Sequence, residues 1–122
     1  MAKRLIVRGE EAEIIVELAE GSVANELWDR LPLETRATLR GEELYFPVLL
    51  PTATEAPEPK AVEEGDVAYW PPEHALCLFC GNTHARTSKD DPLTPVGRIV
   101  GGMEDCGLVR QNETLRIEAS EG

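Results

Sequence analysis

Apolar and polar side chains alternate with a period of two through most of the first forty residues. In residues 11–18, EAEIIVEL, apolar side chains occupy the even positions and three glutamates occupy odd ones. Residues 33–40, LETRATLR, repeat the pattern with threonine, glutamate and arginine between the apolar positions. Because successive side chains of a strand point to opposite faces, these segments predict half-buried strands with one polar face. The chain is therefore expected to be mainly β.

One segment interrupts this alternation. Gly21 and Ser22 offer a stop and an N-cap, and Val23, Leu27 and Leu31 then recur at four-residue spacing. Apolar residues at that spacing form one stripe on a helix, and Pro32 ends the run. The sequence predicts one principal amphipathic α-helix near residues 22–31.

The remaining strands are expected in LIV (residues 5–7), GEELYFPVLL, DVAYW, HALCLFCG, VGRIVGG and TLRIEA. Together with the first segments they make about eight short strands, and closing into an antiparallel barrel protects the edges of so many strands. Residues 51–66 contain three prolines and five acidic residues, which is typical of a surface loop. The prediction is a closed antiparallel barrel with an acidic, proline-rich loop.

The length of 122 residues fits a single domain, 1–122, and the net charge of −11 disfavours two classes of partner. Nucleic acid and anionic membranes both require a basic surface, and this chain has no basic run. The N-terminal segment lacks the pattern of a signal peptide, and no apolar run approaches the ~20 residues that span a bilayer. We expect a cytoplasmic protein whose three cysteines are reduced.

The stretch CLFCG, residues 77–81, resembles half of a zinc knuckle. On a strand, however, Cys77 and Cys80 would point to opposite faces, with Leu76 and Leu78 beside Cys80 and with Phe79 beside Cys77. A structural zinc site needs four ligands, and no second paired motif supplies them. The pattern favours a buried strand, and we expect neither a metal nor a cofactor. Catalysis by either thiol would need a base brought near by folding.

Three segments in order, GEELYFPV, GDVAYWPPEHALCLFCGNT and PVGRIVGGMEDCGLV, resemble the small bacterial and archaeal cyclophilin-like family. The resemblance implies a closed antiparallel barrel of about eight strands. True cyclophilins isomerise peptidyl-prolyl bonds with an arginine on the strand that corresponds to GEELYFPV. This chain has no arginine between Gly41 and Pro51.

The resemblance also implies a ligand groove on the outside of the barrel. Phe79 corresponds to the phenylalanine at the base of the proline pocket, and Tyr45 or Phe46 stands near the missing arginine. The candidate ligand-binding residues are Glu43, Tyr45, Phe46, Trp70, Pro71, Cys77, Phe79 and Arg98. The chain has only two each of Trp, Tyr and Phe, so core packing is the alternative role for any one of them. For Arg98 the alternative is a solvated partner of the acidic surface.

These observations favour a barrel that binds a peptide or small ligand in an aromatic groove without efficient isomerase chemistry. A divergent peptidyl-prolyl isomerase is the alternative. A structural or protein-interaction module is a third interpretation. The sequence names neither the ligand nor the oligomeric state.

Overall fold

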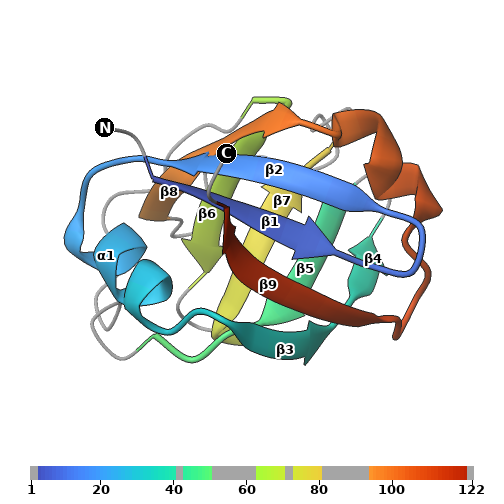
Figure 1. Cartoon of the computed structure of the whole chain (residues 1–122), viewed down its shortest axis with the longest axis horizontal. Coiled ribbons are helices and arrows are strands. Elements are labelled where there is room, and N and C mark those ends of the chain that lie inside the picture. The colour runs from blue at the N-terminus through green and yellow to red at the C-terminus, as the bar shows by residue number, and fades with distance from the viewer. Residues whose placement is uncertain (1–2, 41–42, 51–62, 71–72, 81–93, 121–122) are drawn as a thin grey trace.

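The computed structural model of the chain describes residues 3–40, 43–50, 63–70, 73–80 and 94–120, and these residues form a mainly antiparallel β structure (Figure 1). Its strands are β1 (Arg4–Arg8), β2 (Glu13–Leu18), β3 (Leu33–Arg36), β4 (Thr38–Arg40), β5 (Glu43–Pro47), β6 (Asp66–Trp70), β7 (Ala75–Phe79), β8 (Thr94–Gly101) and β9 (Thr114–Ser120). The helices are α1 (Ser22–Asp29) and the 3-10 helix η2 (Met103–Leu108). The predicted mainly β fold with one α-helix is confirmed.

The described strands form one antiparallel sheet in the order β3-β9-β1-β2-β8-β6-β7-β5-β4. The two end strands, β3 and β4, are consecutive in the chain and are separated only by Ala37. The Ala37 N–H donates to the carbonyl of Glu113 at 2.9 Å, and the Thr35 hydroxyl donates to the carbonyl of Pro47 at 2.7 Å. This bent segment nearly closes the barrel, and its break at Ala37 raises the number of strands above the expected eight.

Alternate side chains of the strands fill the barrel interior. The largest fully buried side chains, from strands, α1 and the segment after β5, are Tyr69, Phe46, Phe79, Leu5, Ile14, Leu27, Leu44, Leu50, Leu76, Leu78 and Leu115. Of these, Phe79 alone lies outside the main core. Removing this apolar area from water is the main stabilising contribution to the fold.

Helix α1 packs Val23, Ala24 and Leu27 into the main core. Figure 1 shows α1 at one end of the barrel and η2 at the other. The N-cap residue is Gly21 and makes no side-chain capping bond, so the expectation that Ser22 is the N-cap is wrong. Neither helix of the described part is long and apolar enough to cross a membrane.

A buried hydroxyl ties the segment after β5 to β6. The Tyr69 hydroxyl donates to the carbonyl of Val48 at 2.7 Å and accepts from the Leu50 N–H at 3.2 Å. Both backbone groups therefore have partners away from solvent. Burial raises the pKa of Tyr69, because the charged phenolate would lose its hydration inside the core.

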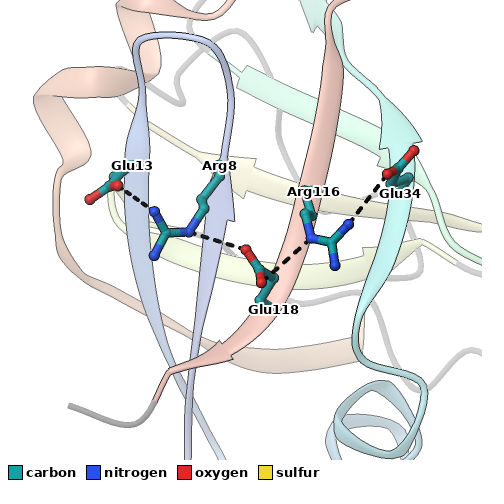
Figure 2. A network of polar contacts seen from close by, with 5 residues as sticks. All are labelled: Arg8, Glu13, Glu34, Arg116 and Glu118. Carbon is teal, nitrogen blue, oxygen red and sulfur yellow. Dashed lines mark hydrogen bonds and ion pairs between the residues drawn. The ribbon is translucent and has the colours of Figure 1, made fainter.

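The outer face of β1, β2, β3 and β9 carries a chain of ion pairs, which we call the charged face (Figure 2). Arg8 pairs with Glu13 at 2.6 Å and with Glu118 at 3.2 Å. Arg116 pairs with Glu118 and with Glu34, each at 3.4 Å. Opposite charges directly across neighbouring strands stabilise a sheet modestly. This face is the polar side that the alternating sequence predicts.

Candidate functional site

A second apolar cluster lies on the face of β5, β6 and β7 that points away from the main core. It consists of Tyr45 from β5, Ala68 and Trp70 from β6, and Cys77 and Phe79 from β7, and we call it the outer-face cluster. Three strands that are neighbours in the sheet supply it. It brings together four of the residues expected in the ligand groove.

Strand register explains how the outer-face cluster forms. Tyr45 and Ala68 are both Cα partners of Cys77, one on each side of β7. Cross-strand partners share a face, so these three side chains lie together. Leu76 and Leu78 belong to the main core instead, which confirms the two faces predicted for HALCLFCG.

The outer-face cluster has a buried floor and two more accessible aromatic side chains. Cys77 and Phe79 have exposed fractions of 0% and 1%, whereas Tyr45 and Trp70 are only partly buried. A buried ring and thiol form an apolar, polarisable surface, and a tyrosine or tryptophan at its border offers a ring to stack and a polar tip. Such a surface suits an apolar ring or a short aliphatic group.

Glu43 adds a carboxyl group beside this floor. It is the Cα partner of Phe79, and its exposed fraction is 8%. It is the one charged residue that is buried in the described part of the chain. The oxygens of a carboxyl group accept hydrogen bonds, so Glu43 can orient a donor group of a ligand.

Two further candidates lie elsewhere, and a third falls outside the described residues. Phe46 has an exposed fraction of 0% in the main core and is the Cα partner of Leu76. The sheet therefore separates Phe46 from the outer-face cluster, and the candidate site is drawn without it. Arg98 is exposed on β8, 3.7 Å from the carboxylate of Asp66, in the surface role that the sequence left as its alternative. Pro71 lies outside the described residues, as does most of the expected loop at 51–66.

The structure joins Cys80 and Cys106 in a disulfide, with 6.2 Å between their Cα atoms. That separation lies within the ordinary range for disulfides. The expectation that all three cysteines are reduced is therefore wrong for this pair. The sequence offered no signal for the pairing, because Cys106 stands alone in GMEDCGLV and 26 positions separate it from Cys80.

Within the ranges that the structure describes, no group of three or more histidine, cysteine, aspartate or glutamate side chains is placed to hold a metal ion. Cys77 and Cys80 lie on opposite sides of β7, and the sulfur of Cys80 is bonded to that of Cys106. Cys77 lies in β7 and Cys80 directly follows that strand, so the two sulfurs of this stretch are in different surroundings.

Comparison with known families agrees with this architecture. Residues 3–118 match the family model described as Cyclophilin-like. The chain belongs to the Cyclophilin-like family. The solution structure of a hypothetical protein from Archaeoglobus fulgidus is similar to this Cyclophilin-like chain, with 35% sequence identity and a TM-score of 0.73. The alignment covers 98% of this chain and 95% of the archaeal one. No curated protein matches.

The Cyclophilin-like match spans β1 to β9 up to Glu118, so it includes every residue of the outer-face cluster. The family resemblance drawn from the sequence is thereby confirmed. The archaeal protein is itself described as hypothetical, so this Cyclophilin-like relative adds the fold and no activity.

Proposed function

We propose that this Cyclophilin-like chain binds a peptide or small ligand on the outer-face cluster and lacks efficient isomerase chemistry. One observation carries the proposal: β5, β6 and β7 build a second apolar cluster on the side away from the core. The outer face of an antiparallel sheet usually carries charged or polar residues. Here three strands instead bring together aromatic side chains and a cysteine, as in the apolar centre of a binding interface. The family resemblance associates the same strands with a ligand groove.

The ligand would contact the two accessible aromatic side chains first. Tyr45 and Trp70 lie on β5 and β6, on either side of β7. Stacking on one or both rings, with Phe79 and Cys77 beneath, would desolvate an apolar ring of the ligand. The Tyr45 hydroxyl and the Glu43 carboxylate supply polar groups at the same face.

Efficient prolyl isomerisation would require a further element. The barrier of about 18–20 kcal/mol arises from resonance between the prolyl nitrogen and the preceding carbonyl. Lowering it requires a preorganised donor aimed at that nitrogen, and losing one such donor costs ~10²–10³ in rate in other enzymes. In β5, ELYFP, the Tyr45 hydroxyl is the sole side-chain donor. Binding can persist without it, because binding and rate acceleration depend on different contacts.

Nuclear magnetic resonance titration tests the binding proposal. We expect succinyl-Ala-Ala-Pro-Phe-p-nitroanilide to shift the amide signals of Tyr45, Trp70 and Phe79, and to leave those of Arg8 and Arg116 on the charged face unchanged. Trp70→Ala should weaken binding about tenfold, the loss of roughly 1.4 kcal/mol of stacking. The matched control is Trp28→Ala, which removes the other tryptophan, in α1. Shifts confined to the charged face, or absent at high peptide concentration, would exclude this site for such peptides.

A coupled-protease assay on the same peptide tests the chemistry. We expect the catalysed rate to lie at least about a hundredfold below that of an ordinary cyclophilin. Activity within about tenfold, abolished by Trp70→Ala and kept by Trp28→Ala, would favour the divergent isomerase instead.

A further inference from the structure

The Cys80–Cys106 disulfide joins two parts of the barrel that are not neighbours in the sheet. Cys80 directly follows β7, and Cys106 lies in η2, which connects β8 to β9. In the strand order β8-β6-β7, the bond therefore ties the end of β7 to the far end of β8, past β6. A covalent link at this place restrains the β7 end beyond what strand pairing provides.

Helix η2 is also attached to β2 and to the main core, by contacts other than the disulfide. The Asp105 carboxylate accepts the backbone N–H of Glu13 on β2 at 3.1 Å. Val109, directly after η2, is 3% exposed and packs in the main core. These contacts do not involve the disulfide. Opening the S–S bond would therefore leave η2 seated on β2 and remove one restraint from the β7 end, which stays paired with β5 through Phe79 and Glu43.

Cys80, which the opened bond would no longer hold, is next in the chain to Phe79 in the floor of the outer-face cluster. The last Cα pair between β6 and β7 is Val67 with Leu78, one residue before Phe79. Beyond that pair, the Gly65 N–H donates to the carbonyl of Phe79 at 2.7 Å, and Cys80 then enters the disulfide. Ladder ends are the places where strands open locally. The disulfide thus reinforces the backbone that positions the Phe79 ring.

We propose that the Cys80–Cys106 disulfide is a redox-controlled tether that orders the floor of the outer-face cluster. Reduction would loosen Phe79, expose Cys77 and weaken ligand binding, because a preorganised surface binds more tightly than one that must be ordered. The structural part of this proposal is independent of any ligand, whereas its effect on binding rests on the proposed function.

The chemistry is thiol–disulfide exchange with a small dithiol. One thiolate of the dithiol attacks a sulfur of the pair, and the second thiolate resolves the mixed disulfide. The Cys80–Cys106 bond breaks, both sulfurs gain a proton, and the dithiol leaves as its cyclic disulfide after giving up two electrons. Cys80 is partly exposed, which gives the dithiol access. A low-molecular-weight disulfide reverses the reaction.

Cys77 provides a direct reporter of the tether. In the oxidised protein it is the one thiol outside the disulfide, and in Cys80→Ser/Cys106→Ser it is the one thiol that remains. We expect iodoacetamide to label Cys77 at least about tenfold faster in this double variant, because labelling follows local opening of the buried cluster. Wild-type protein that is reduced with dithiothreitol and then separated from it without oxygen should give the same rate at Cys77, since free dithiothreitol would itself consume iodoacetamide. Cys77→Ala in the double variant sets the background.

The same samples are then titrated with succinyl-Ala-Ala-Pro-Phe-p-nitroanilide. The proposal predicts a Kd about three- to tenfold higher for the double variant, with an unchanged circular dichroism spectrum. A faster Cys77 rate without peptide binding by either form would support the tether and count against the proposed function. Equal Cys77 rates, or more than one reactive thiol in the oxidised protein, would overturn the tether. Unfolding of both the double variant and the reduced wild type would overturn it too, since a switch requires two folded states.

Discussion

The two outer faces of the barrel differ in what they present beyond the same core. On the charged face, the side chains of Arg8 and Glu13 are 45% and 60% exposed and form ion pairs across β1 and β2. On the opposite part of the sheet, Cys77 and Phe79 of β7 are buried although they also point away from the core. One part of the barrel's outer surface thus contacts solvent, and the other part is a second apolar layer.

The strand sequences carry this difference. β1, RLIVR, alternates between buried and more exposed positions, whereas every residue of β7, ALCLF, is buried. A strand that is buried on both faces reads as a continuous apolar run, and a strand with one solvated face reads as an alternating one. A continuous run in an otherwise alternating barrel therefore marks the part of the sheet where something other than solvent contacts the outer face.

The largest expected effect tests whether the outer face of β7 behaves as core. Phe79→Ala should lower the free energy of unfolding by about 3–5 kcal/mol, because it leaves a cavity at a residue that is 1% exposed. Leu78→Ala, on the core face of the same strand, is the matched comparison at about 2–5 kcal/mol. Urea denaturation measures both. A loss below about 1 kcal/mol for Phe79→Ala, with a full loss for Leu78→Ala, would show that the outer face is an open surface.

The next effect concerns the polar group buried on the core side of β6. Tyr69→Phe should lower the free energy of unfolding by about 1–3 kcal/mol, because the Val48 carbonyl and the Leu50 N–H both lose their partner. The pKa of Tyr69 is raised in the folded protein, so its contribution is complete below the unfolded value of about 10 and declines as the pH rises above it. Urea denaturation from pH 8 to pH 11 should therefore show a steeper alkaline loss in the wild type than in Tyr69→Phe. Parallel profiles would contradict the raised pKa.

The smallest effect belongs to the charged face. Glu118→Gln breaks ion pairs with both Arg8 and Arg116, and we expect it to cost about 0.5–1 kcal/mol at low salt. In about 1 M NaCl the cost should shrink, because salt screens exposed charges. Glu17→Gln removes a single pair, with Arg4 at 3.1 Å, and is the matched control with a smaller loss. A loss above about 2 kcal/mol that persists in salt would mean that the two outer faces contribute alike.

Much of the fold could be predicted from the sequence, because backbone periodicity alone determines which residues share a face. The alternation in residues 11–18 and 33–40 indicates strands, and the spacing of Val23 and Leu27 indicates the helix. The number of strands could not be predicted as well. The division of residues 33–40 depends on two hydrogen bonds with a distant part of the chain: the Ala37 N–H donates to Glu113, and the Ala37 carbonyl accepts from Asn112. The local sequence pattern does not contain these contacts.

The candidate site could be predicted only in part. Alternation together with family resemblance brought Tyr45, Trp70, Cys77 and Phe79 to one face, and the structure clusters them. The sequence could not decide whether Tyr45 or Phe46 faces the candidate site, because a shift of one residue exchanges the two faces of a strand. In the structure, register with Cys77 puts Tyr45 on the outer face, and Phe46 lies in the main core. The disulfide was missed because it depends on tertiary proximity, which spacing along the chain does not report.

The bend at Ala37 has a consequence for the order of folding. On one side of it, β4 pairs with β5, its neighbour along the chain, and on the other side β3 pairs with β9, with most of the chain in between. Closing a long loop costs more entropy than closing a short one, and non-local strand pairing is slow for that reason. We therefore expect β4 and β5 to pair early and the barrel to close last, when β3 meets β9. Leu44→Ala should then slow folding, whereas Leu115→Ala should mainly speed unfolding, and stopped-flow kinetics of the two variants would measure that order.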